Sequence, residues 1–147
     1  MSNELADFAD YIFDRLMHTI DGISESELNW KPVEETNSIH WILTHTTRIA
    51  YLLIPQVISG THNPAGWDDN YEQQKHSFED LKNDLDKARK LVVNDIRDLD
   101  EKQLEKKVNI WGKERPLKEP IFALLGELLH HNGQMAMLRG IYKRTTA

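Results

Sequence analysis

The sequence predicts an all-α protein, an up-down four-helix bundle with a short irregular or strand-like segment before the last helix. Three observations support this class. Apolar residues recur every three or four positions through four long segments, and residues that favour helix starts and stops lie at the ends of these segments. Little of the chain shows the alternation of apolar and polar residues that is typical of a strand. A chain of 147 residues fits one domain, so we expect residues 1–147 to form a single bundle.

The first two helices are expected in the N-terminal part of the chain. The first spans about residues 3–20 and is ended by Gly22, since glycine readily adopts the left-handed conformation of a helix stop. The second begins near Asn37 or Ser38, both good N-cap residues, and continues through Ile54. We expect Pro55 to kink or end this helix, because proline removes a backbone donor and crowds the preceding turn.

Two further helices are expected in the C-terminal part. The third begins at Ser77 and carries one apolar stripe among densely charged faces, which is typical of a solvated wall of a bundle. Residues 101–116 are ambiguous and fit either a short strand or a loop folded over the bundle end. The fourth helix begins around Leu117, with Pro120 tolerated in its first turn.

Composition excludes several classes of function. The 18 basic and 24 acidic residues give a formal net charge of −6, which argues against binding of nucleic acid. No apolar run approaches the roughly 20 residues that span a bilayer, so no membrane segment is expected. The absence of cysteine excludes disulfides, thiolate metal ligands and a cysteine nucleophile. With no secretion signal at its start, the chain is expected to be cytoplasmic.

Polar side chains occupy the core-facing stripe of the fourth helix. On a helical plot, Glu127, His131 and Gln134 fall in one narrow sector among apolar residues. Glu127 and His131 are four positions apart and are therefore neighbours, with Cβ atoms roughly 5–6 Å apart. In the second helix, His45 shares an apolar face with Trp41. Because an unpaired buried carboxylate is disfavoured, His45, Glu127 and His131 together predict a metal site between two helices.

Other interpretations of these residues remain open. Glu127 and His131 could form a buried hydrogen bond while His45 is an ordinary core histidine, which is the better explanation for each residue taken singly. Glu127 with His130 has the Glu-x-x-His spacing of di-iron bundles, but the other helices offer no second motif of this kind. His40 is expected to point away from the site, toward solvent or another subunit.

Three motifs carry a family resemblance that extends over nearly the whole chain. They are Leu28-Asn-Trp30-Lys-Pro32, Ser38-Ile-His-Trp41-Ile-Leu-Thr-His45, and His130-His131-Asn-Gly-Gln134 followed by Leu138-Arg139. These resemble motifs of the DinB/YfiT-like superfamily of metal-binding four-helix bundles, whose last run reads His-His-Arg-Gly-Gln. The resemblance implies one ligand at His45 and two, four apart, at position 127 and His131. The chain departs from the family in Glu127, where the family has histidine, and in Asn132, where it has arginine.

The resemblance also implies a cofactor and a class of reaction. We expect one divalent ion, zinc, nickel, iron or manganese, with open positions for water or substrate. The carboxylate of Glu127 makes the site harder, which favours manganese, iron or zinc over nickel. The implied activity is metal-dependent hydrolysis or transfer to a small-molecule thiol. Gln134 is expected to orient a ligand, and Trp41 either walls the cavity or packs in the core.

Two further expectations concern partners. Arg48 and Arg139 either bind a carboxylate of a small-molecule substrate or lie on the solvated surface. A homodimer through exposed apolar faces follows from the resemblance. The alternative is a noncatalytic bundle that binds a small ligand or dimerises after losing its activity.

Overall fold

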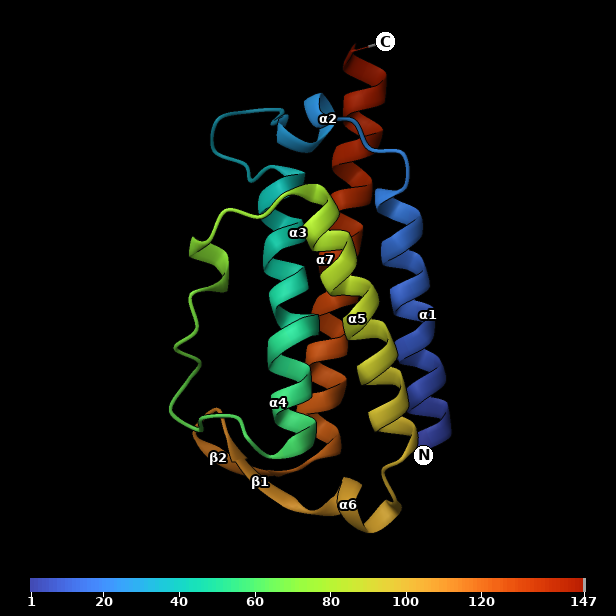
Figure 1. Cartoon of the computed structure of the whole chain (residues 1–147), viewed down its shortest axis with the longest axis vertical. Coiled ribbons are helices and arrows are strands. Elements are labelled where there is room, and N and C mark those ends of the chain that lie inside the picture. The colour runs from blue at the N-terminus through green and yellow to red at the C-terminus, as the bar shows by residue number, and fades with distance from the viewer. Residues whose placement is uncertain (147) are drawn as a thin grey trace.

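Four long helical rods lie side by side in the computed structural model, which describes residues 1–146 (Figure 1). They are α1 (Ser2–Ile20), the combined segment at 39–59, α5 (Phe78–Arg97) and α7 (Lys118–Thr146). The segment 39–59 consists of α3 (Ile39–Arg48), the π turn η1 (Ile49–Leu53) and α4 (Ile54–Ser59). The predicted helical bundle is confirmed.

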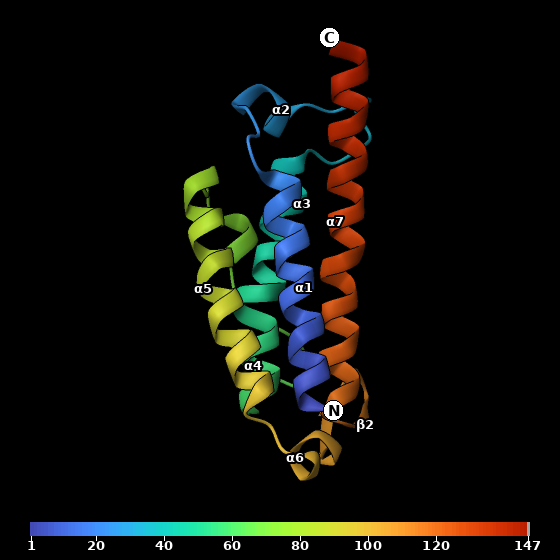
Figure 2. The ribbon, with the colours of Figure 1, turned by 90° about the vertical axis from the view of Figure 1, so that its right-hand side faces the viewer.

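The helices run in two directions. α1 and α7 point one way, whereas α3–α4 and α5 point the other way (Figures 1 and 2). Ion pairs of Arg89 with Asp10 and of Arg97 with Asp7 reflect the antiparallel packing of α1 on α5. The connection 60–77 returns along the outside of α4 and α3, so α5 runs parallel to α3–α4 and the order is not a simple alternation.

Side-chain caps fix the starts of the helices. The hydroxyl of Ser38 accepts a hydrogen bond from the backbone N–H of Trp41 at 3.1 Å, which begins α3 as predicted. Ser77 does the same for α5, accepting from the N–H of Asp80 at 3.0 Å. Because the first N–H groups of a helix have no partner within it, these caps satisfy donors that would otherwise be unpaired.

Pro55 was expected to kink or end the second rod, and the rod does not end there. The turn η1 precedes it, and there the N–H of Ile54 bonds to the carbonyl of Ile49, five residues back. Pro55 then lies in the first turn of α4, a position that tolerates proline. The rod stops instead at Gly60, whose φ of 76° is the left-handed conformation of a helix stop.

The ambiguous segment before the last helix forms a short helix and a hairpin. These are α6 (Glu101–Glu105), β1 (Lys107–Ile110) and β2 (Lys113–Pro116), at the end of the bundle where α1 begins (Figure 1). Trp111 and Gly112 form the turn with φ values of 53° and 82°, which suits a two-residue hairpin loop. The strand-like alternative is therefore the one that the chain adopts.

The connector after α1 contains a further short helix, α2 (Glu25–Asn29), which the sequence analysis did not predict. Leu28 is buried beneath it, and Trp30 packs edge-on against Tyr142 of α7 with ring centroids 5.4 Å apart. Both residues attach the connector to the bundle. No helix within residues 1–146 combines the length and apolarity needed to cross a membrane.

The apolar stripes of the four rods meet in one core. Its largest fully buried side chains come from the first three rods and include Phe13, Leu16, Leu43, Ile54, Leu81, Leu85 and Ile96. The last rod, α7, adds the buried Ile121, Leu125 and Leu128. The outer side of α7 is also apolar, and Phe122, Leu129 and Met137 are exposed there. The core holds α3 and α7 in direct contact, and the candidate site lies between these two helices.

Candidate metal centre

Two of the predicted ligands, His45 of α3 and His131 of α7, lie against each other between the two helices. Their ring centroids are 4.8 Å apart and their planes are inclined by 84°, an edge-to-face arrangement. Both residues lie within rods that pack together: His131 is in the middle of α7, and His45 is in the last turn of α3, after which its rod continues into η1. The packing of the rods therefore fixes where the two imidazoles meet.

The third predicted ligand, Glu127, lies one turn before His131 at the edge of this contact. Its Oε2 atom is 3.5 Å from Nε2 of His131, and 55% of its side chain is exposed. The expectation of a buried carboxylate was therefore wrong, because the buried side of α7 is formed by positions such as Leu124, Leu128 and Asn132. More than half of the Glu127 side chain is therefore accessible to solvent.

Both imidazoles use their Nδ1 atoms for hydrogen bonds. Nδ1 of His131 donates to Oε1 of Gln134 at 2.8 Å, and Nδ1 of His45 donates to the carboxylate of Glu72. Nε2 of His131 is buried and has no hydrogen-bond partner among residues 1–146. With Nδ1 protonated, this Nε2 carries a lone pair, and a buried lone pair without a partner is unfavourable.

These donors fit the divalent ion that the family resemblance implies. Ligating histidines commonly donate one ring N–H to an oxygen and bind metal through the other nitrogen, and both rings here use Nδ1 for such a hydrogen bond. Glu127 adds a carboxylate next to Nε2 of His131. In the part of the chain that the structure describes, however, no three His, Asp or Glu side chains are already grouped to hold one ion.

Trp41 and His130 flank the two imidazoles. The indole of Trp41 stacks on His45 with ring centroids 5.3 Å apart, and 47% of the residue is exposed. Trp41 therefore covers the outer side of His45 and is not a core residue. His130 is exposed, with its ring 5.2 Å from that of His131 and its Nε2 3.5 Å from Nε2 of Gln134.

The contact between Glu72 and His45 was missed by the sequence analysis. Glu72 lies in the short turn η2 (Tyr71–Gln73) of the connection 60–77, which reads only as a polar loop. Arg48 of α3 fastens this loop by pairing with both carboxylate oxygens of Asp69, at 2.9–3.0 Å. No local spacing could reveal this, because the contacts depend on the path of a loop across the outside of α3.

Neither arginine considered as a substrate ligand is free in the structure. Arg48 forms an ion pair with Asp69, and its Nη1 lies 3.9 Å from Oε1 of Glu72. Arg139 donates to both oxygens of the buried Glu27 at 2.7 and 3.0 Å and to two backbone carbonyls. Both arginines therefore join parts of the fold to each other.

The contact between Arg48 and Asp69 should make stability depend on acid. Hydrogen bonding to the Arg48 guanidinium holds the pKa of Asp69 below its ordinary value of 3.8. The contact thus stabilises the fold fully above that pH, and this contribution is lost as pH falls through the lowered pKa. Asp69→Asn, which retains an acceptor for the N–H of Tyr71, should cost about 1 kcal/mol at neutral pH.

Urea unfolding of the wild type and Asp69→Asn at several pH values measures this effect. The difference in free energy of unfolding between the two proteins should shrink toward zero as the pH falls below 3.8, the ordinary pKa of aspartate, and through the lowered pKa of Asp69. An equal difference at neutral and acid pH would contradict the assigned role of the charge.

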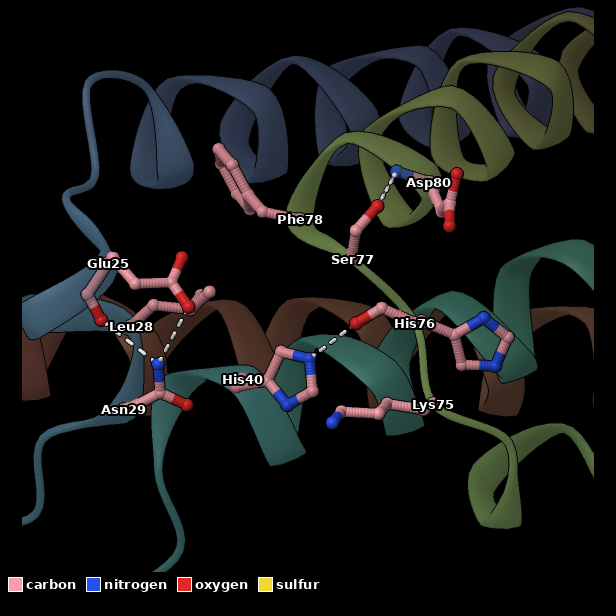
Figure 3. Close-up of a pocket in the computed structure, with 9 residues that line it drawn as sticks. All are labelled: Glu25, Leu28, Asn29, His40, Lys75, His76, Ser77, Phe78 and Asp80. Atoms are coloured by element: carbon pink, nitrogen blue, oxygen red, sulfur yellow. Dashed lines mark hydrogen bonds between the residues drawn. The ribbon is translucent and has the colours of Figure 1, made fainter.

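Two hollows lie beside this group of residues. One of about 220 Å³ is bordered by Trp41 and Glu72. A larger one of about 440 Å³, drawn in Figure 3, lies between α2, α3 and the start of α5. His40 lines both, and its Nε2 donates to the carbonyl of His76 at 2.8 Å. His40 was expected to face solvent or another subunit; it instead contacts the segment that leads into α5.

Comparisons with known proteins agree with this architecture. A family model described as the DinB superfamily matches residues 10–135. The fold is similar to a structure described as the conserved protein of locus from Enterococcus faecalis, with a TM-score of 0.74, 15% sequence identity and 95% of each chain covered. At this identity the similarity concerns the fold alone. No protein with a curated description matches the chain.

Proposed function

Because the chain belongs to the DinB superfamily, we propose that it is a metal-dependent enzyme in which His45, Glu127 and His131 hold one divalent ion. The observation that supports this most directly is the buried Nε2 atom of His131, which has no partner within residues 1–146 and lies beside the Glu127 carboxylate. The imidazole of His45 lies against the same ring. A cation would satisfy the lone pair and bring the three side chains together.

The proposed reaction is hydrolysis or transfer to a small-molecule thiol. An ion with three protein ligands retains open positions, and it lowers the pKa of a bound water or thiol so that a nucleophile forms at neutral pH. Gln134 orients the ring of His131 through its hydrogen bond to Nδ1. Trp41 shields one face of His45 from water. The hollow of about 220 Å³ beside Trp41 and Glu72 is the place proposed for a small substrate.

Metal analysis tests this proposal first. Protein purified without chelator, and apoprotein reconstituted with zinc, manganese, iron or nickel, should each hold about one ion per chain by mass spectrometry of the elements. Metal-loaded protein is then screened with hydrolytic substrates and with thiol–electrophile pairs, and apoprotein serves as the control. Binding without turnover would favour a noncatalytic bundle that binds a small ligand. Absence of stoichiometric binding would overturn the proposal and leave Glu127 and His131 as a structural pair.

A further inference from the structure

The contact between the Glu72 carboxylate and Nδ1 of His45 gives the candidate centre a fourth participant. We propose that Glu72 is a positioning residue, which holds His45 in the Nδ1–H tautomer and leaves Nε2 free to bind the ion. This inference rests on the proposed function, because it assigns Glu72 a role toward the same centre. A carboxylate that accepts from a ligating histidine fixes the ring and raises its basicity.

The turn that carries Glu72 is held in place before any ligand arrives. Asp69 is fastened to Arg48 and also accepts from the N–H of Tyr71 at 3.1 Å. Tyr71 is buried, donates its hydroxyl to Asp84 of α5 at 2.7 Å, and stacks on His76 with ring centroids 4.1 Å apart. Folding itself therefore orders the loop, and the carboxylate needs little rearrangement to orient His45.

The two imidazoles are oriented by chemically different acceptors. His131 donates to the neutral amide oxygen of Gln134, whereas His45 donates to the charged Glu72. The side chains of His45 and Glu72 are 26% and 27% exposed, so their interaction is partly shielded from water. Glu127 and Glu72 each carry a negative charge, and Arg48, whose Nη1 lies 3.9 Å from Glu72, offsets part of the second. The amide at His131 supplies orientation, and the carboxylate at His45 supplies orientation and charge.

Glutamine and alanine substitutions at position 72 test these two contributions. Glu72→Gln retains an oxygen that can accept from Nδ1 but removes the charge, and Glu72→Ala removes both. Glu34→Gln is the matched control, because Glu34 is an exposed acid whose carboxylate pairs with Lys31. Thermal unfolding followed by circular dichroism establishes that each variant is folded.

The first readout is the tautomer of His45 in the metal-free chain, from long-range ¹H–¹⁵N correlation spectra. Signals of His45 are assigned by their loss in His45→Ala. The wild type, Glu34→Gln and Glu72→Gln should keep Nδ1 protonated, and Glu72→Ala should show a mixture of the two tautomers. An unchanged tautomer in Glu72→Ala would overturn the inference.

The second readout is the affinity for Zn²⁺, measured by titration calorimetry. Glu72→Ala should bind about 10–100-fold more weakly than the wild type, with unchanged stoichiometry, and Glu72→Gln should lose less. Loss of stoichiometric binding in both variants would make Glu72 a ligand and overturn its positioning role. If the wild type binds no Zn²⁺, the proposed function fails, and the tautomer measurement still decides whether Glu72 orients His45.

Discussion

Replacing His45 or His131 with alanine should abolish tight binding of a divalent ion. Each substitution removes one of three proposed ligands. Loss of a residue that only supports a ligand weakens metal binding by up to about 100-fold, so loss of a ligand should weaken Zn²⁺ binding further. Calorimetric titration of the chelator-treated chain measures the loss directly. Thermal unfolding offers a second measurement, because an ion at 100 times its dissociation constant stabilises the wild type by about 2.7 kcal/mol.

His130→Ala is the matched control for these variants. It removes an imidazole from the position next to His131, but this side chain is exposed and bonds only weakly with Gln134. Its metal content should stay close to that of the wild type. Complete loss of metal in His130→Ala, with retention in His131→Ala, would favour the alternative pair Glu127 and His130. Unchanged stoichiometry in both His45→Ala and His131→Ala would overturn the ligand assignment.

Replacing Arg139 with methionine should destabilise the fold by about 3–5 kcal/mol, because it leaves a buried carboxylate without its counter-charge. Glu27 is 4% exposed, and Arg139 supplies both of its charged hydrogen bonds. Arg139 also donates to the carbonyls of Thr19 and Asp21, at 2.8 and 2.7 Å, which ties α7 to the end of α1. Urea unfolding monitored by circular dichroism measures the change.

Two variants separate the charge effect from a general loss of side chain. Arg144→Met removes an exposed arginine from the same helix and should change stability by less than about 0.5 kcal/mol. The double variant Glu27→Leu with Arg139→Met should recover part of the loss, since apolar side chains can replace a buried ion pair. Equal unfolding midpoints for Arg139→Met and Arg144→Met would show that the pair contributes little.

Local signals were sufficient to predict the rods of the fold. Ser38 and Ser77 mark helix starts because their hydroxyls satisfy N–H groups only three residues ahead. The hairpin was one of two open alternatives, and it depends on a turn in which both Trp111 and Gly112 have positive φ. The direction of α5 could not be predicted, because the sequence of the polar connection 60–77 does not indicate that this segment runs back along the length of the bundle.

The candidate site was predictable only in its helical part. His45 and His131 face each other because each lies on the side of its helix that meets the other. Glu127 lies in the same sector of the helical plot of α7 as His131. Its exposure, however, depends on how closely the neighbouring helices approach that side of α7. Glu72 and Arg139 act through partners far along the chain, at His45 and Glu27, so their roles follow from tertiary packing alone.

The π turn at Ile49–Leu53 sets the relative rotation of the two halves of its rod. A π turn accommodates one residue more than an α-helical turn, and each residue of an α-helix advances the side-chain direction by about 100°. Deleting one residue there would let a continuous α-helix form, but His45 and the buried Val57 could no longer both keep their present orientations. The extra residue thus allows His45 to face α7 while Val57, at the opposite end of the same rod, remains buried.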